Sequence, residues 1–197
     1  MSTHIERKRL RMNTGIRAAA LPAVVTVAML FAMIAAAGCS DDSTPTPAAS
    51  PEEIGLQEVE VEAPDFTLET MDGEQVTLSA LRGTPILLNY WQLNCPPCRE
   101  EMPFLDAAAA HYAGQIIVMA IDIGDSEASV REYFDGAQLS MIVPLDLAGQ
   151  AAGRYSVGFT PTTFLIDSQG IVRYVKVGPF TDASQVIASI ELIVPEA

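Results

Sequence analysis

From residue 63 onward, short strand-like runs alternate with longer helix-like segments. Residues 86–91 (ILLNYW) and 115–122 (QIIVMAID) are almost continuously apolar, a pattern typical of parallel strands that are covered on both faces. The segment between them opens with two prolines and keeps apolar positions as far as Ala110, which predicts a helix kinked at Pro103. This order of strand, helix and strand predicts one compact α/β domain.

Two pairs of segments show the alternation expected of β-hairpins. Residues 65–69 and 75–78 flank an Asp-Gly turn, and this dipeptide favours a tight connection between antiparallel strands. Residues 161–167 and 171–177 flank a turn at Ser-Gln-Gly, and we expect this second hairpin at an edge of the sheet.

Four more elements follow from local signals. Ser126 is suited to cap a helix that leads to a strand over residues 141–144, and residues 148–155 predict a short helix. Asp182 is expected to cap a last helix, because apolar residues recur after it at steps of three and four.

The first 38 residues have the pattern of an export signal. Residues 1–17 carry five Arg and Lys residues, and residues 18–37 are uncharged and mostly apolar. A basic segment followed by an apolar one and small residues is typical of a signal peptide, here residues 1–38. The sequence Ala-Ala-Gly-Cys-Ser at positions 36–40 resembles the lipobox of bacterial lipoproteins, which implies that Cys39 is lipidated; an uncleaved signal anchor is the alternative.

The segment after Cys39 is rich in Pro, Ser, Thr and acidic residues. It predicts a disordered tether over residues 39–62, ahead of a folded domain at 63–197. Removing residues 1–38 takes away 5 of the 11 basic and 1 of the 25 acidic residues, which leaves a net charge of −18. This charge argues against a nucleic-acid partner and leaves the lipid as the membrane contact.

Cys95 and Cys98 enclose the two prolines at the predicted junction of strand and helix. Proline suits the first turn of a helix, so Cys95 is expected at the N-terminus, where free amides and the helix dipole favour a thiolate. Cys98 lies one turn further on the same face, close enough to form and open a disulfide. The pair therefore predicts thiol-disulfide exchange.

A cysteine pair at this spacing can also have other uses. A structural disulfide across so short a loop removes little entropy from the unfolded chain. A zinc site needs two further Cys or His ligands, and the chain offers only Cys39, His4 and His111. A module that binds Cu(I) through the two thiolates, with Met102 nearby, remains an alternative.

Three blocks of sequence together resemble the TlpA/ResA branch of the thioredoxin superfamily, which comprises membrane-tethered extracytoplasmic thiol-disulfide oxidoreductases. They are residues 63–66 (APDF), 91–103 (WQLNCPPCREEMP) and 155–167 (YSVGFTPTTFLID). The resemblance covers residues 63 to 194. It implies a thioredoxin-like fold, with a central mixed sheet flanked by helices and an N-terminal β-hairpin extension.

The first block also occurs in peroxiredoxins, which makes a peroxidase a further alternative. A peroxidatic cysteine normally follows a proline by seven residues and a threonine by three. At these positions before Cys95 the chain has Leu88 and Gln92, which disfavours a peroxidase.

The resemblance also suggests roles for single residues. Cys95 is the expected nucleophile, and Cys98 resolves the mixed disulfide. Glu101 resembles the active-site glutamate of the ResA type and is expected to take the proton of Cys98, with a solvated helix acid as the alternative. Asn89 stands where cytoplasmic thioredoxins hold a buried carboxylate, which removes that proton acceptor.

The Thr160–Pro161 bond resembles the cis-proline loop that faces the active site in thioredoxin folds. A cis bond would leave the backbone of Thr160 free to bind an extended substrate strand. Trp91 either floors the active site or packs in the core.

The function predicted from these observations is an anchored extracytoplasmic oxidoreductase that reduces exported proteins. Apocytochrome c is a substrate class that the resemblance suggests. Outside the cytoplasm cysteines become oxidised, so such a protein needs a membrane thiol electron donor to recharge it. No cofactor and no metal is expected.

Overall fold

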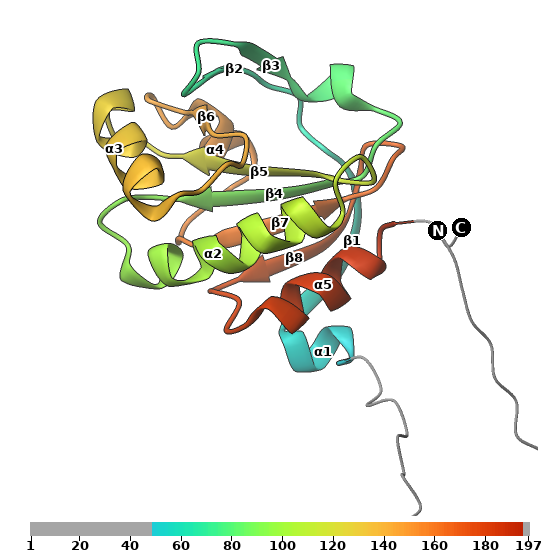
Figure 1. Cartoon of the computed structure of the whole chain (residues 1–197). Helices are drawn as coiled ribbons and strands as arrows, with labels where there is room; N and C mark the ends of the chain where they lie inside the picture. Colours follow the sequence, from blue (N-terminus) through green and yellow to red (C-terminus); the bar gives the residue numbers. More distant parts are fainter. Residues whose placement is uncertain (1–48, 195–197) are drawn as a thin grey trace, which may run out of the picture. The chain divides into compact units, whose positions relative to one another are not determined.

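The computed structural model describes residues 49–194, in which eight strands form one mixed sheet of order β1-β8-β7-β4-β5-β6-β2-β3 (Figure 1). In chain order the elements are α1 (Pro51–Ile54), β1 (Leu56–Glu62), β2 (Thr67–Thr70), β3 (Gln75–Thr77), the 3₁₀ helix η1 (Leu78–Leu81), β4 (Ile86–Trp91), α2 (Pro96–His111), β5 (Ile117–Asp122), α3 (Glu127–Ala137), β6 (Pro144–Leu145), α4 (Gln150–Arg154), β7 (Thr162–Ile166), β8 (Ile171–Val177) and α5 (Ala183–Glu191). The structure confirms the thioredoxin-like α/β fold, in which helices flank a central mixed sheet.

The two apolar runs form the centre of the sheet. β4 and β5 are parallel, with Ile86 opposite Ile117 and Trp91 opposite Asp122. All six residues of β4 are buried, because the sheet is covered on both faces here. The carboxyl ends of both strands therefore lie at the same edge, where α2 begins.

Two hydrophobic clusters lie on the two faces of the sheet. One joins apolar residues of α2, α3 and α5, among them Leu105, Phe134 and Val186. The other includes Ala151 of α4, Leu78 of η1 and Phe164 of β7. Figure 1 shows α2 and α5 side by side on one face. The sheet is thus the middle of three layers, with its core divided between the two sides.

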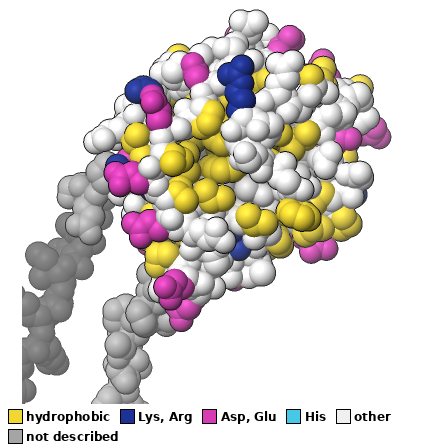
Figure 2. All heavy atoms as spheres, turned by 180° about the vertical axis from the view of Figure 1, so that it is seen from behind, with side chains coloured by type: hydrophobic (Ala, Val, Ile, Leu, Met, Phe, Trp, Pro, Cys, Tyr) yellow, Lys and Arg dark blue, Asp and Glu magenta, His cyan; other side chains and the backbone are white. Residues whose placement is uncertain are grey.

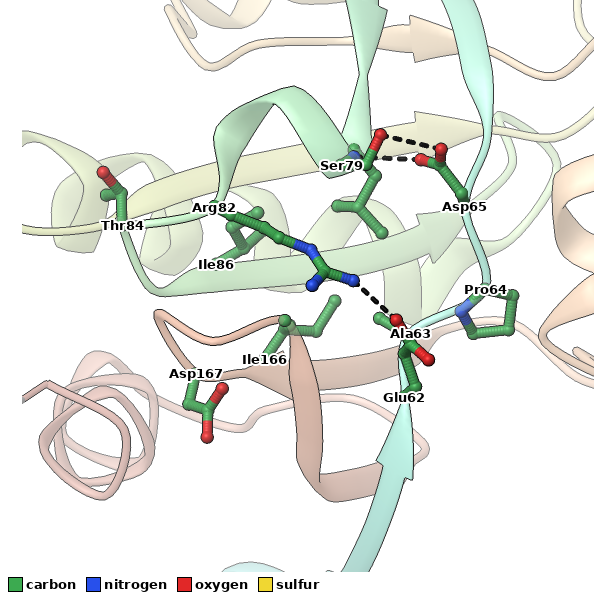
Figure 3. Close-up of a pocket in the computed structure, with 12 residues that line it drawn as sticks. Glu62, Ala63, Pro64, Asp65, Ser79, Arg82, Thr84, Ile86, Ile166 and Asp167 are labelled. Carbon is green, nitrogen blue, oxygen red and sulfur yellow. Dashed lines mark hydrogen bonds and ion pairs between the residues drawn. The ribbon is translucent and has the colours of Figure 1, made fainter.

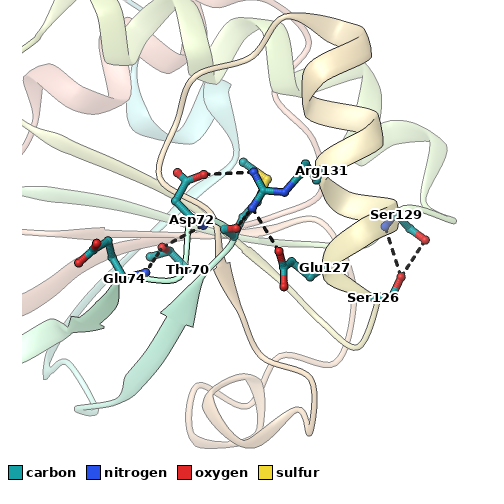
Figure 4. Close-up of polar contacts among 8 residues, drawn as sticks. Thr70, Asp72, Glu74, Ser126, Glu127, Ser129 and Arg131 are labelled. Atoms are coloured by element: carbon teal, nitrogen blue, oxygen red, sulfur yellow. Dashed lines mark hydrogen bonds and ion pairs between the residues drawn. The ribbon is translucent and has the colours of Figure 1, made fainter.

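The hairpin of β2 and β3 forms as predicted, with Thr67 opposite Thr77. Arg131 of α3 ties its turn to the rest of the domain, since the guanidinium contacts the carbonyl oxygen of Met71 and the carboxylates of Asp72 and Glu127 (Figure 4). These ion pairs are exposed, so they position the hairpin more than they stabilise it.

The N-terminal part of the folded domain differs from the expectation. The disordered tether was expected to reach residue 62, but residues 51–54 form α1 and residues 56–62 form β1. The sequence LQEVEVE hides this strand because only Leu56 is buried. Glutamates on an edge strand hinder its pairing with other chains. They also give this segment the composition of a polar linker.

The presence of β1 changes the place of the second hairpin. β7 and β8 pair as predicted, but β1 pairs with the outer side of β8, so β8 is not an edge strand. The strand expected at residues 141–144 is shorter and later, at Pro144–Leu145. Pro144 has no N–H to donate, and an isolated bridge between Met119 and Ile142 is all that precedes it.

The predicted caps are confirmed. The hydroxyl of Ser126 accepts a hydrogen bond from the backbone N–H of Ser129, and the carboxylate of Asp182 accepts one from Gln185. The predicted signal peptide and Cys39 lie outside the described residues. Across residues 49–194, none of the helices has the length and apolar character needed to cross a bilayer.

Candidate active site

The two cysteines lie where β4 gives way to α2. Pro96 and Pro97 form the first turn of α2, as predicted, and Cys95 is its N-cap residue. A disulfide joins Cys95 to Cys98, and the Sγ atom of Cys95 lies 3.3 Å from the backbone nitrogen of Cys98. An anionic sulfur at this place would face the free amides of the helix, which stabilises a thiolate.

The two sulfurs differ in access to solvent. Cys95 is 8% exposed, whereas Cys98 is fully buried. A partner can therefore reach Cys95 first, and Cys98 is left to react from inside the protein. This asymmetry is what a nucleophile followed by a resolving cysteine requires.

A pair of aspartates holds the loop that leads to Cys95. The carboxylate of Asp125 accepts a hydrogen bond of 2.7 Å from the backbone N–H of Leu93. Asp122 in turn accepts one of 2.9 Å from the backbone N–H of Asp125. Asp122 is fully buried, and its burial, together with the nearby charge of Asp125, raises its pKa to about 7. Neither residue was predicted from the sequence as part of the site, although Asp122 ends the strand next to Trp91.

Glu101 is a buried acid on the same helix as Cys98, three residues further on. Its two carboxylate oxygens accept hydrogen bonds from the side-chain amide of Asn89 at 2.9 Å and from the backbone N–H of Phe180 at 2.8 Å. Its side chain is fully buried, so it is not the solvated acid of the alternative. Burial raises its pKa to about 7, although both hydrogen bonds and the charge of Lys176 oppose the shift.

Asn89 thus has a place in the site. From the sequence, Asn89 was predicted only to replace the buried carboxylate that cytoplasmic thioredoxins hold at this position of the strand. The amide instead donates to Glu101 and, at 3.0 Å, to the hydroxyl of Thr163 on β7. The buried acid of this site comes from α2, and the strand supplies its hydrogen-bond donor.

Lys176 on β8 is a third residue whose place in the site was not predicted from the sequence. Only 7% of it is exposed, its ammonium group donates to the carbonyl oxygen of Ile54 at 2.9 Å, and it lies 5.4 Å from the centre of the Phe180 ring. Burial lowers its pKa, and the charge of Glu101 acts in the opposite direction. Lys176 therefore places a cation near Glu101.

The Thr160–Pro161 bond is cis, as predicted. The carbonyl oxygen of Thr160 lies 3.5 Å from the Sγ atom of Cys95, and Thr160 is partly exposed. The loop before β7 therefore adjoins the outer sulfur.

Trp91 belongs to the core and not to the floor of an open site. It is fully buried, its indole N–H donates to the carbonyl oxygen of Ala120, and its ring packs on Tyr133 and Phe134. Of the two roles expected for Trp91, the structure favours packing in the core, because a fully buried side chain cannot contact a substrate in this conformation.

A separate pocket lies at the start of β4, away from the redox pair (Figure 3). Two pairs of its polar side chains contact each other: Asp65 accepts two hydrogen bonds from Ser79, and Arg82 pairs with Glu62 at 2.6 Å. The APDF block therefore has a structural role here, because Asp65 holds the 3₁₀ helix η1. Among residues 49–194, no group of three or more His, Cys, Asp or Glu side chains is placed to hold a metal ion.

The chain is similar in sequence to a known family and to proteins of known name. The model of the AhpC/TSA family matches residues 59–175. The thioredoxin-like protein YneN of Bacillus subtilis is 36% identical over 135 residues, which are 67% of this chain and 78% of that protein. The thiol-disulfide oxidoreductase ResA of the same organism is 33% identical over 123 residues, 62% of this chain and 69% of ResA.

A solved structure extends the agreement to the fold. The chain is similar to a thiol:disulfide interchange protein DsbE from Chlorobium tepidum, with a TM-score of 0.59 and 30% sequence identity. The similarity covers 68% of this chain and 99% of that structure.

Proposed function

Because the chain belongs to the AhpC/TSA family and is a thiol-disulfide oxidoreductase of the thioredoxin superfamily, we propose that it reduces disulfides of exported proteins through Cys95 and Cys98. The observation that carries this proposal is the ordering of the two sulfurs, with Cys95 at the helix N-cap and Cys98 fully buried behind it.

The first step uses the reduced protein. The Cys95 thiolate attacks one sulfur of a substrate disulfide, a mixed disulfide forms, and the second substrate sulfur leaves as a thiolate that is protonated by solvent. The helix N-terminus stabilises the attacking charge. The substrate chain lies along the Thr160 backbone and donates to it or accepts from it.

The second step releases the product. Glu101 takes the proton of Cys98, whose sulfur then attacks the Sγ atom of Cys95 and displaces the remaining substrate sulfur as a thiolate. Two electrons pass from the cysteine pair to the substrate, and the Cys95–Cys98 disulfide is restored. A base with a pKa of about 7 suits this step, because it is largely free of its proton just above neutral pH.

The direction of electron flow is tested by the reduction potential of the pair. The full-length chain is equilibrated with dithiothreitol or glutathione buffers, and the free thiols are then alkylated and counted. A potential near or below about −250 mV is expected for a reductant, whereas a value above about −150 mV would make the protein an oxidant.

The proposed location is the extracytoplasmic face of the cell membrane. The support is the signal-like segment over residues 1–38 and the lipobox-like sequence that ends at Cys39. Acyl chains on Cys39 would hold the protein at the bilayer. Lipidation is tested by growing cells with a labelled fatty acid. The label should be incorporated into the protein and be lost in Cys39→Ser. A label that persists in the variant, or a protein recovered without lipid, would contradict lipidation at Cys39.

Apocytochrome c is proposed as one substrate. A membrane thiol electron donor would then reduce the Cys95–Cys98 disulfide back to two thiols. A peptide with an oxidised Cys-X-X-Cys-His segment should be reduced by the prereduced protein. The copper alternative is tested by metal analysis of the reduced chain, in which stoichiometric tight copper would favour the binding module.

A further inference from the structure

An open groove of about 380 Å³ lies on the face of the sheet that α2 and α5 leave uncovered. Its walls come from β1, β7, β8 and the loop that precedes Pro161. Figure 2 looks at the molecule from behind the view of Figure 1 and shows apolar side chains gathered across this side, with acidic side chains mainly around the rim. We call this feature the β1–β8–β7 groove.

The pairing of the strands explains why the floor of the groove is apolar. Phe164 lies opposite Val175, and Thr162 lies opposite Val177. Gln57 of β1 also lies opposite Val175. Residues that face each other in an antiparallel pair point to the same side of the sheet, so these five side chains form one continuous surface.

Two apolar side chains at the groove are largely open to solvent. Phe159 is 76% exposed and Val177 is 55% exposed. None of the residues that line the groove is charged, although the chain as a whole has a net charge of −14. Contiguous exposed apolar surface with a polar rim is typical of a binding site for a polypeptide.

The groove begins where a substrate has to dock. Phe159 directly precedes Thr160, whose carbonyl oxygen lies 3.5 Å from the Sγ atom of Cys95. The hydroxyl of Thr162, on the floor of the groove, donates to the carbonyl oxygen of Phe159 at 2.8 Å. The same short loop therefore forms the rim of the groove and the contact with the reactive sulfur.

We propose that the β1–β8–β7 groove binds an apolar side chain of the substrate polypeptide, a few residues from the cysteine that Cys95 attacks, and that Phe159 and Val177 determine this preference. The inference rests on the proposed function, since it concerns the substrate of that reaction. The backbone of Thr160 binds a substrate of any sequence, whereas the groove would select substrates by the residues around their cysteine.

The dimensions of the groove set the position of the preferred residue. Neighbouring strands lie about 4.8 Å apart and an extended chain advances about 3.3 Å per residue, so three strands correspond to about three residues of substrate. A leucine or phenylalanine within about three residues of the substrate cysteine should reach the groove, whereas a charged residue there would lose its hydration without gaining a partner.

The test uses three small disulfides and the prereduced full-length chain in single-turnover reactions. One is a peptide whose single cysteine forms a mixed disulfide with glutathione and is flanked by leucines. The second has serines in place of the leucines, and the third is oxidised glutathione. In each case the protein dithiol becomes a disulfide and the substrate is released as two thiols.

The variants are Phe159→Ser and Val177→Ser. The matched control is Leu192→Ser, which removes another exposed apolar side chain at the end of α5, outside the groove lining. We expect each groove variant to lower the second-order rate constant for the leucine peptide about tenfold, because the variant loses the burial of one apolar side chain. Rates for the serine peptide and glutathione should stay within about twofold, as should every rate of the control.

Two results would overturn the inference and leave the proposed function intact. They are a wild-type protein that reduces the leucine and serine peptides at equal rates, and groove variants that slow all three substrates equally. Concentration-dependent dimerisation that Phe159→Ser abolishes would assign the groove to a second copy of the chain and would also overturn it. A wild-type protein that reduces none of the three disulfides would overturn the proposed function itself and the inference with it.

Discussion

Glu101 and Asp122 are both fully buried acids near the redox pair, and burial raises the pKa of each to about 7. Their surroundings differ. Both oxygens of Glu101 accept hydrogen bonds, and the Lys176 ammonium group is near. Asp122 accepts one hydrogen bond at Oδ1, while its Oδ2 has no partner among the described residues, and Asp125 adds a second negative charge.

This difference separates an acid that can gain and lose a charge from one that is best kept neutral. Two donors and a cation stabilise the Glu101 carboxylate, so ionisation costs little reorganisation there. An Asp122 carboxylate leaves one buried oxygen without a donor. We therefore assign proton transfer to Glu101 and the positioning of the loop before Cys95 to Asp122.

The strongest test of this comparison is Glu101→Gln. Glutamine cannot accept the Cys98 proton, so release of the mixed disulfide should slow by about 100-fold, in the range typical of general-base catalysis. Quenched-flow measurement with thiol trapping should show that the mixed disulfide accumulates.

Glu100→Gln is the matched control, because Glu100 is an exposed neighbour on the same helix. Its rate should equal that of the wild type. Equal slowing in both variants, or a Glu101→Gln rate within twofold of the wild type, would remove Glu101 from the proton transfer.

Asp122→Asn should change stability more than rate. The folded-state pKa of about 7 lies above that of the unfolded chain, so the native state holds the extra proton between about pH 4 and 7 and loses stability as pH rises through this window. Asparagine removes that cost. Between pH 4.5 and pH 8 the variant should gain on the order of 3 kcal/mol relative to the wild type, measured by urea unfolding of the oxidised protein.

The same measurement on Glu101→Gln sharpens the contrast. Glutamine has one acceptor oxygen for the two donors that Glu101 accepts from, so its NH2 group would face either the Asn89 amide or the Phe180 N–H, and no comparable gain at pH 8 is expected. A gain of equal size in both variants would show that the two acids do not differ as proposed.

Asp125→Ala should have a smaller effect, on the first step. Leu93 loses the acceptor that holds the loop before Cys95, and we expect the attack on a small disulfide to slow about fivefold, in line with the loss of a charge-assisted hydrogen bond. Asp125→Asn keeps an acceptor oxygen and should restore most of the rate. An asparagine variant as slow as the alanine variant would contradict a positioning role.

The sequence could predict the parts of this site that depend on local pattern. The proline pair places Cys95 at the helix N-cap, and the helical period places Glu101 on the side of Cys98. The partners of Glu101 could not be predicted in this way, since Asn89 and Phe180 come from other elements and Phe180 is 79 residues away in sequence. Strand β1 was not predicted, because only one of its residues is buried and its glutamates give no clear alternation of apolar and polar positions.

Lys176→Met should have the smallest effect and bears on why Glu101 can carry a charge. Methionine keeps the apolar stem but removes the cation, so the pKa of Glu101 should rise and a higher pH should be needed to free the base. The midpoint of the pH profile for mixed-disulfide release should move upward by about half a unit, a modest shift for one charge in a site of intermediate dielectric. Arg173→Met is the control, because Arg173 is a more exposed cation on the same strand as Lys176 and pairs with Asp167 and Glu60. A midpoint that stays in place would mean that the two hydrogen bonds alone stabilise the carboxylate, and the contrast with Asp122 would then rest on the unpaired oxygen.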